Sequence, residues 1–341
     1  MVRKILVVRT DKMGDVILAT PVLEILRNIF CESHIAMLVQ SYTEDIIRGN
    51  KNVNEILLSD NKTILELKKI FKERKFDAAI VLFPRFKIAL ALFLAGVKIR
   101  IGTAYRWYSF LFNKRVYVHR SRIEKHEVEY NIDLVKKLIS IAKIKGDIFQ
   151  PKLSIYISQD DEKTANTFFE KTQVNKDDVV VGIHPGSFGS ALNWPVENYA
   201  KLADELILTH KYKVLVTGTQ KDAELVNTLC KLMMAKPLIL PNNFSIKQLA
   251  AVLKRCPVFV SGSTGPMHLA AAVDTSTVSL FPPIFVCSPK RWSPWGNKQK
   301  ILMPEDLSCK ICTYDKCKNY NCMQKITVEE VLNNILELLK Q

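Results

Sequence analysis

Hydrophobic and polar residues follow two distinct patterns along the chain. Short apolar runs, such as 4–8, 34–39 and 258–261, are typical of strands buried on both faces of a parallel sheet. Between these runs, apolar residues recur every three or four positions, as in the segment 126–142, which predicts amphipathic helices. Regular alternation of the two patterns predicts an α/β fold built on parallel sheets.

The alternation occurs as two series of similar length. The first predicts strands at 4–8, 34–39, 55–58, 76–83 and 99–102 and helices at 18–29, 62–74, 88–95 and 126–142. The second predicts strands at 179–184, 213–217, 238–240, 258–261 and 277–281 and helices at 195–209, 221–234, 246–254, 266–273 and 328–339. Two such series indicate two Rossmann-like domains facing a central cleft, with ligands at the carboxyl ends of the strands.

The polar segment 151–159 separates the two series and is the expected linker. We therefore predict an N-terminal domain at 1–157, a second domain at 158–325 and a C-terminal helix within 326–341. A length of 341 residues is sufficient for two hydrophobic cores.

Positive charge is concentrated in the first half of the chain. The net charge is +15, and the segment 68–125 contains 15 Lys and Arg against 3 Asp and Glu, with five aromatic residues between 105 and 112. Two interpretations remain open: a solvated basic rim over core aromatics, or a surface for an anionic partner such as phospholipid or a phosphorylated glycolipid. No nucleic-acid-binding motif accompanies this charge, so we expect no nucleic-acid partner.

No apolar segment has the length of a membrane span. Crossing a bilayer takes about 20 consecutive apolar residues, and the longest apolar run covers only 88–97. Arg9 interrupts the N-terminal apolar run before it reaches the length of a secretory signal. We therefore expect a cytoplasmic protein, and a peripheral contact of the basic segment with an anionic inner membrane stays an open alternative to the solvated rim.

The loop after the first strand carries candidate chemistry. Gly14 is expected to permit a tight turn, Lys12 lies in the same loop, and Asp15 stands where the next helix begins. Asp15 could be a helix cap, or a carboxylate at the ligand edge that accepts a proton from a hydroxyl group.

Two loops of the second series are suited to phosphate. The loop 184–195 is rich in Gly and Ser around Ser187, and a later loop carries Thr264 and Gly265, with His268 one turn into the following helix. Backbone N–H and hydroxyl groups at a helix start bind phosphate, although a lone His on a helix is more often structural. Neither loop has a P-loop or Gly-x-Gly-x-x-Gly pattern. Two such loops at strand ends favour a nucleoside diphosphate.

Asp222 follows the predicted strand at 213–217. An acidic residue in this place can bind ribose hydroxyls, and a solvated surface carboxylate is an equally acceptable interpretation.

Four of the eight cysteines lie close together near the C-terminus: Cys309, Cys312, Cys317 and Cys322. Four thiolates could bind a structural zinc, and the first pair has metal-type spacing. The second pair is more widely spaced, and reduced thiols or a local disulfide are the preferred interpretations. The other four cysteines, Cys31 among them, are expected to be small core residues.

Several motifs occur in an order that resembles glycosyltransferase family 9, the ADP-heptose:lipopolysaccharide heptosyltransferases. They are Gly-Asp-Val-Ile-Leu-Ala-Thr-Pro at 14–21, Ala-Gly-Val-Lys-Ile-Arg-Ile-Gly at 95–102, His-Glu-Val-Glu-Tyr-Asn at 126–131, His-Pro-Gly at 184–186, Trp-Pro at 194–195 and Ser-Thr-Gly-Pro-Met-His-Leu-Ala at 263–270. The similarity covers most of the chain. It implies a GT-B fold whose last helix often crosses back to the first domain. It also implies an inverting, metal-independent sugar transfer, and the sequence contains no Asp-x-Asp motif.

The resemblance assigns roles to individual residues. Asp15 matches the general base, which would deprotonate an acceptor hydroxyl as it attacks the anomeric carbon. The donor-binding positions are matched by Ser187, Asp222, Ser263, Thr264, Gly265 and His268. The implied donor is ADP-heptose, with no separate cofactor, and the implied acceptor is an anionic glycolipid of the lipopolysaccharide core.

Two positions depart from the family pattern. Leu192 stands where many members carry a Lys beside the leaving diphosphate, and Ser263 stands where many carry Asp. Loss of the Lys removes a cation that stabilises the leaving group. Either the donor is different, or a cation from Lys12, Lys290 or Arg291 substitutes.

Two alternatives therefore stand beside a family 9 heptosyltransferase. One is a transferase that uses a different nucleotide sugar, and the other is a non-catalytic nucleotide-sugar-binding relative. A nucleotide-sugar 2-epimerase, which is another GT-B enzyme, would require a different set of carboxylates and histidines.

Overall fold

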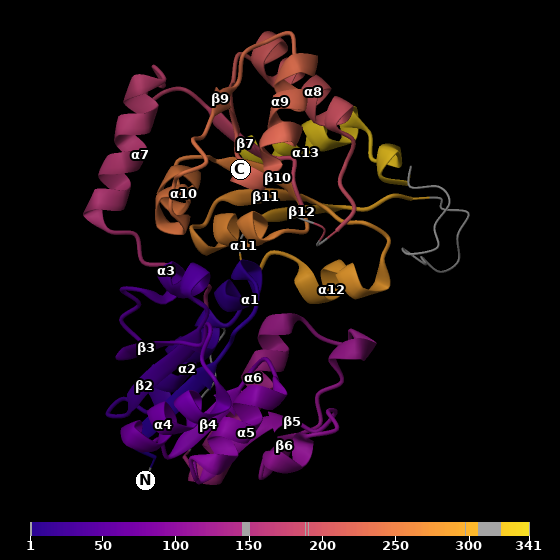
Figure 1. Cartoon of the computed structure of the whole chain (residues 1–341). Coiled ribbons are helices and arrows are strands. Elements are labelled where there is room, and N and C mark those ends of the chain that lie inside the picture. Colours follow the sequence, from indigo (N-terminus) through magenta and orange to yellow (C-terminus); the bar gives the residue numbers. More distant parts are fainter. Residues whose placement is uncertain are drawn as a thin grey trace. The chain divides into compact units, whose positions relative to one another are not determined.

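The computed structural model describes residues 2–144, 151–187, 189, 191–296, 298–305 and 322–340. The chain divides into two compact units, Met1–Tyr156 and Ile157–Gln341, and each unit has its own sheet (Figure 1). The division follows Tyr156, inside the segment expected to be the linker. Among the described residues, no helix combines the length and the apolar character that a bilayer span requires.

The first unit contains a six-stranded parallel sheet in the order β3-β2-β1-β4-β5-β6. Its strands are β1 (Lys4–Val8), β2 (His34–Val39), β3 (Glu55–Leu58), β4 (Ala78–Val81), β5 (Ile99–Thr103) and β6 (Lys114–Val116). Its α-helices are α1 (Met13–Ile17), α2 (Thr20–Ile29), α3 (Glu44–Ile47), α4 (Ile64–Arg74), α5 (Phe86–Leu94) and α6 (Glu127–Ala142). Short 3-10 turns are η1 (Ser41–Thr43), η2 (Ser109–Leu111) and η3 (Arg120–Arg122).

The second unit repeats this topology in the order β12-β11-β10-β7-β8-β9. Its strands are β7 (Val180–His184), β8 (Lys213–Val216), β9 (Leu238–Ile239), β10 (Val258–Gly262), β11 (Ser276–Leu280) and β12 (Gln299–Leu302). Its α-helices are α7 (Gln159–Lys171), α8 (Val196–Asp204), α9 (Ala223–Leu232), α10 (Ile246–Leu253), α11 (Gly265–Ala272), α12 (Pro289–Trp292) and α13 (Val328–Leu339). Short turns are η5 (Gln220–Asp222), η6 (Phe285–Cys287) and η8 (Cys322–Lys325), and α8 continues into a turn of π-helix at Glu205–Thr209.

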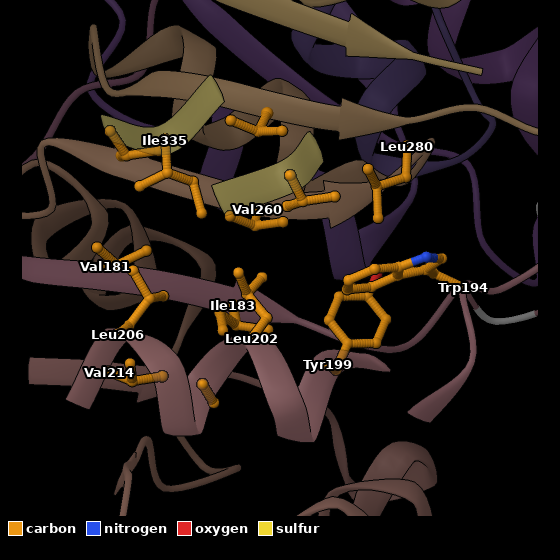
Figure 2. Close-up of a cluster of buried hydrophobic side chains, with 14 of the residues drawn as sticks. Val181, Ile183, Trp194, Tyr199, Leu202, Leu206, Val214, Val260, Leu280 and Ile335 are labelled. Carbon is orange, nitrogen blue, oxygen red and sulfur yellow. The ribbon is translucent and has the colours of Figure 1, made fainter. Parts of the chain in front are cut away.

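Apolar faces of the helices explain how each sheet is covered. In the first unit, α4 and α5 pack on the face that carries Leu6 and Val8. In the second, α8, α9 and α13 pack on the face that carries Val181 and Ile183, and Figure 2 shows Trp194 beside the α8 residues of this cluster. The opposite face of the second sheet is covered by α7 and α10.

Local sequence signals set the start of several helices. The N-cap side chains of α4, α7 and α10 accept the backbone N–H three residues later, where a Glu, Asp or Gln side chain reaches back to the N-cap backbone. Helix α6 begins in the same way with His126 and Glu129. This cap fixes the start of α6, whose residues Glu127 and Asn131 belong to the candidate site described below.

The α/β fold with two parallel sheets is confirmed, but some elements differ from the prediction. Strands β6 and β12 were missed because they are short and rich in Lys, Arg and Gln, as edge strands often are. The predicted helix at 18–29 is preceded by a separate short helix, α1, and α2 begins at Thr20 with Pro21 in its first turn.

Helix α13 packs on the sheet of the second unit. Its buried residues Val331, Ile335 and Leu338 belong to the apolar cluster of the second unit, and α13 contacts α8, β10, β11 and β12. The apolar face of α13 is therefore used within its own unit, and the expected contact of this helix with the first domain stays a prediction.

The scattered cysteines follow the prediction only in part. Cys256 is buried and belongs to the cluster under α10, which suits a small apolar residue. Cys31 is exposed because it lies in the turn after α2, so its expected place in a core was wrong.

Candidate functional site

The loop after β1 lies where the order of the first sheet reverses. Strands β2 and β3 continue to one side of β1, and β4, β5 and β6 continue to the other. Ligands of open α/β sheets bind beyond the carboxyl ends of the strands at such a reversal. Arg9 immediately follows β1, and Asp15 lies in α1, so both residues stand at this edge.

A buried guanidinium organises this edge. Arg9 is only 2% exposed, and its Nε donates to Asp11 Oδ1 at 2.8 Å. One Nη group donates to Asp15, and the other donates to Glu127 Oε1 at 2.9 Å and to Asn131 Oδ1 at 3.2 Å. A single side chain thereby connects three carboxyl groups, one from the loop after β1, one from α1 and one from α6.

Residues from α6 and η3 complete the cluster. Arg120 donates to Glu127 Oε1 at 3.0 Å and to Asn131 Oδ1 at 3.1 Å. Asn131 also donates through its Nδ2 to the carbonyl of Leu18 at 3.2 Å, which ties α6 to the end of α1. The cluster of Arg9, Asp11, Asp15, Arg120, Glu127 and Asn131 is called the Arg9 cluster below.

Burial changes the proton affinities in the Arg9 cluster. It raises the pKa of the Asp11 carboxyl to about 7; Arg9 opposes the rise, and Asp15 adds to it. Burial alone would lower the pKa of Arg9, but the surrounding carboxylates outweigh it and raise that pKa, so Arg9 carries its charge. Tyr42 donates its hydroxyl to the carbonyl of Asp11 at 2.9 Å, and burial raises the Tyr42 pKa to about 12. Tyr42 is therefore neutral at pH 7.

The three candidate residues near the end of β1 differ in burial and in contacts. Asp15 is not the cap of α1, because the N-cap is Lys12 and the Asp15 carboxylate binds Arg9. Lys12 is exposed. Gly14 lies inside the first turn of α1, and among the described glycines only Gly49, Gly96, Gly189 and Gly296 have positive φ. The tight turn expected at Gly14 was therefore wrong.

The second sheet also reverses its order, between β7 and β10. At this edge His184 ends β7, and its Nδ1 lies 3.0 Å from the Oγ1 of Thr217, which follows β8. Burial lowers the pKa of His184, and the nearby carboxylate of Asp222 only partly opposes it. His184 is therefore a neutral, buried hydrogen-bonding group at the end of the central strand.

Asp222 is buried, so it is not a solvated surface carboxylate. Its Oδ2 accepts the backbone N–H and the hydroxyl of Thr219 at 2.9 and 2.7 Å, as a capping box does. Its Oδ1 lies against Gly186, where an added Cβ would be only 2.3 Å away. Gly186 therefore allows the loop after β7 to approach the carboxylate closely.

The loop after β10 presents a buried hydroxyl at the start of α11. Thr264 is the N-cap of α11 and is 5% exposed, yet its side chain makes no cap hydrogen bond. Its Oγ1 has no hydrogen-bond partner among the described residues. Gly265 is the first residue of α11, and His268 lies one turn further on and is buried. An oxygen anion at the N-terminus of α11 would satisfy the Thr264 hydroxyl and the first N–H groups together.

The remaining donor candidates lie at the same edge of the second sheet. Ser187 is buried, and its Oγ donates to the carbonyl of Ala191 at 2.7 Å, which folds the loop after β7 back on itself. Ser263 is half-buried between β10 and Thr264. The structure thus brings the ends of β7, β8 and β10 together around His184, because these three strands are adjacent in the sheet.

Comparison with known proteins identifies the family of this chain. The family model of glycosyltransferase family 9 (heptosyltransferase) matches residues 64–323. The chain belongs to glycosyltransferase family 9, and it is a glycosyltransferase.

Relatives match this family member over nearly their whole length. Lipooligosaccharide heptosyltransferase 2 of Campylobacter jejuni is 26% identical over 339 residues, which is 96% of each chain. The family 9 glycosyltransferase of Veillonella parvula has a TM-score of 0.85 at 24% identity, covering 99% of this chain and 97% of that one. The E. coli ADP-heptose lipopolysaccharide heptosyltransferase II has a TM-score of 0.79 at 23% identity, covering 99% of both. Both structures share the GT-B type fold.

The two departures from the family 9 pattern occupy ordinary structural environments. Leu192 is partly buried against the apolar cluster shown in Figure 2, next to the loop in which Trp194 donates its Nε1 to the carbonyl of Ile326 at 2.9 Å. Among the candidate substitute cations, Lys290 is exposed on α12, and the Arg291 guanidinium lies 4.4 Å from the centre of the Trp292 ring. Leu192 thus serves packing at the position where the family resemblance led us to expect a Lys.

The late cysteines fall almost entirely outside the described residues. Of the four, only Cys322 is described, at the start of η8 and half-buried. In the described parts of the chain, no group of three or more His, Cys, Asp or Glu side chains is arranged to hold a metal ion. The zinc alternative for the cysteine cluster stays a prediction.

The sequence analysis selected Asp15 as a candidate but not Arg9, which binds it. It also missed the partners of Arg9 on α6. Glu127 and Asn131 are separated from Arg9 by more than 115 positions, so no local spacing could have linked them. Arg9 itself offered a signal, because an arginine directly after a buried apolar strand must find acidic partners.

Proposed function

We propose that this family 9 member is an inverting, metal-independent heptosyltransferase that moves heptose from ADP-heptose to an anionic glycolipid of the lipopolysaccharide core. The observation that carries the proposal is the Thr264 hydroxyl, buried and without a partner among the described residues at the N-terminus of α11. A helix start with spare N–H groups and a buried hydroxyl is suited to a diphosphate.

The other residues of this edge suit the nucleoside part of such a donor. Asp222 uses Oδ2 for its cap, which leaves Oδ1 beside Gly186 as an acceptor for ribose hydroxyls. His184 and Thr217 are fixed by their mutual contact and form a neutral floor. Similarity to the E. coli ADP-heptose lipopolysaccharide heptosyltransferase II supports ADP as the leaving group.

Asp15 would act as the general base on the acceptor. It takes the proton of the acceptor hydroxyl as that oxygen forms a bond to the anomeric carbon of heptose. The bond from that carbon to the diphosphate breaks, and its electron pair leaves with ADP. Attack opposite the leaving group inverts the anomeric centre. A positioned base of this kind contributes roughly 10²- to 10⁴-fold to the rate.

An aromatic–basic surface of the first unit supports a membrane-embedded acceptor. Phe86 and Trp107 stack at 4.9 Å and are 38% and 74% exposed, with the exposed Arg85 and Arg106 next to them in sequence. Tyr108 and Phe112 are buried, so only part of the aromatic segment belongs to this surface. Exposed aromatic rings with adjacent arginines suit the interface of an anionic bilayer, so we place the enzyme peripherally on the cytoplasmic face of the inner membrane.

Vesicle binding tests the membrane contact. Vesicles containing anionic phospholipid should retain the protein at low salt, and Trp107→Ser should weaken this retention several-fold. Met234→Ser is the control, because Met234 is 81% exposed on the second unit. Equal retention of both variants, or no retention of the wild type, would exclude this surface as the contact.

Calorimetry with nucleoside diphosphates tests the donor. Titration with ADP, UDP and GDP, without added metal, should show selective binding of ADP. Selective binding of UDP or GDP would keep the transferase and discard ADP-heptose, an outcome that Leu192 in place of a Lys makes worth testing. Binding of none of the three would support a non-catalytic relative and contradict the proposal.

A further inference from the structure

The Arg9 cluster contains more negative than positive groups. Asp11, Asp15 and Glu127 are three carboxyl groups, whereas Arg9 and Arg120 are two guanidiniums. Side chains of Asp11, Asp15 and Glu127 are 10%, 16% and 1% exposed, so water compensates little of the difference. A buried excess charge is costly, and one carboxyl group should take up a proton.

The Arg9 fork determines where each carboxylate lies. A guanidinium has five N–H donors in one plane, and hydrogen bonds to Asp11, Asp15, Glu127 and Asn131 use four of them. These donors point in fixed directions, so Asp11 and Asp15 are each held by a different nitrogen of the same group. A lysine ammonium keeps the charge but has no such fork.

We infer that Arg9 is a positioning residue that holds Asp15 in place as an ionised base, and that Asp11 is the carboxyl group that carries the proton. This inference rests on the proposed function for the role of Asp15, but the location of the proton stands independently. The inference assigns roles to Arg9 and Asp11, two residues of the loop after β1. Neither the comparison with family 9 nor the motif at 14–21 assigns a role to them.

The surroundings of Asp11 explain why it, and not its neighbours, takes the proton. Glu127 accepts from both guanidiniums, and Asp11 accepts from Arg9 alone among the described salt bridges. Among the described residues, Tyr42 on η1 also lies beside Asp11, but its hydroxyl donates to the Asp11 backbone carbonyl and supplies no cation to the carboxyl group. Burial accordingly raises the Asp11 pKa to about 7.

Carboxyl carbon NMR of the whole protein, labelled with 13C-aspartate, locates the proton without any substrate. The wild type should show one aspartate that titrates near neutral pH. Asp11→Asn should remove this step, and Asp77→Asn should keep it, because Asp77 binds the opposite end of β1. Loss of the step in Asp15→Asn instead, or absence of a neutral step in the wild type, would overturn the assignment.

Arg9→Lys tests the positioning role and preserves the buried charge. The Asp11 step should move to higher pH, because the bond from Nε that favours the ionised form is lost. The kcat for heptose transfer should fall roughly 10²-fold, as expected for a misplaced base, with ADP affinity unchanged.

A matched arginine separates positioning from general stability. Arg27 in the first unit donates to three backbone carbonyls and to Asn54. Arg27→Lys should lower the melting temperature without changing kcat or the Asp11 step. If Arg9→Lys keeps wild-type kcat or leaves the Asp11 step unmoved, Arg9 does not position the base. If the wild type transfers no heptose, the proposed function is wrong. The NMR titrations still decide whether Asp11 carries the proton.

Discussion

The two units share one strand order but place different groups where that order reverses. After β1 of the first unit, the edge is a charged cluster in which every carboxyl group binds a guanidinium. After β7 and β10 of the second unit, the edge carries small residues, a neutral His184 and the buried Thr264 hydroxyl. The same topology thus supports two kinds of chemistry, which differ in whether the polar groups already have partners.

This difference has a physical meaning. A carboxylate that must accept a proton works best when its position and charge are fixed before the substrate arrives. The hydrogen bond from Arg9 would fix Asp15 in this way. A site that binds a diphosphate instead needs donors that gain partners on binding, as Thr264 offers. The charged edge is therefore expected to affect turnover, and the hydroxyl edge is expected to affect affinity.

Replacement of the base should have the largest effect. Asp15→Asn keeps the size of the side chain but cannot accept a proton, so kcat should fall by about 10²- to 10⁴-fold. ADP affinity measured by calorimetry should stay the same, because the proposed donor-binding edge belongs to the second unit. Asp133→Asn, which removes ion pairs with Lys125 and Lys136 away from the Arg9 cluster, is the control. A variant of Asp15 with near wild-type kcat would remove it as the base and erase the contrast between the two edges.

Removal of Trp194 should destabilise the second unit and leave the charged edge of the first intact. Trp194 is 2% exposed, packs 4.8 Å from the Tyr199 ring and donates to Ile326 (Figure 2). Trp194→Ala should lower the free energy of unfolding by about 3–5 kcal/mol in urea titration. Trp292→Ala, at a less buried site on α12, should cost much less. The neutral Asp11 titration should persist in Trp194→Ala; its loss would mean that the two edges are not independent.

Asp11→Asn should change how stability depends on pH. The Asp11 pKa is raised from 3.8 to about 7 in the folded protein, so the unfolded chain loses this proton first as pH rises. The wild type therefore loses stability between pH 4 and pH 7, whereas Asp11→Asn does not. The variant should be more stable at pH 7 by on the order of 4 kcal/mol. Urea titrations at both ends of this range measure the difference, and parallel curves for the two proteins would argue against a protonated Asp11.

Thr264→Val should have the smallest but most selective effect. It removes a buried hydroxyl that has no partner in the described chain, so the melting temperature should not fall. The affinity for ADP should drop about tenfold, in line with the loss of one hydrogen bond to a charged group. Thr228→Val, at an exposed position on α9, should leave ADP binding unchanged. A lower melting temperature with unchanged ADP affinity would make Thr264 a structural residue.

The sequence predicted the fold well because apolar strand patterns and helix caps are both local signals. Continuous apolar strands such as β1 and β10 and the capped helices between them are recognisable within a few residues. The short edge strands β6 and β12 were missed, since their polar residues resemble loops.

Residues of the candidate site were predictable from the sequence only where each one belongs to a recognisable local pattern. Asp15 and Thr264 could be found because each stands at a strand-to-helix junction. The contacts of Asp15 with Arg9, and of Arg9 with Glu127, depend on tertiary packing of α6 that no local pattern records. Among the neighbouring aromatics Trp107 and Tyr108, the pattern could not tell which is exposed, because the chain turns into η2 directly after them.

Acceptor-dependent release of ADP from ADP-heptose tests the central claim most directly. The wild type, supplied with a lipopolysaccharide-core glycolipid and no divalent cation, should release ADP only when the acceptor is present. Failure to release ADP, or release at the same rate without an acceptor, would contradict a heptosyltransferase in which Asp15 activates the acceptor hydroxyl.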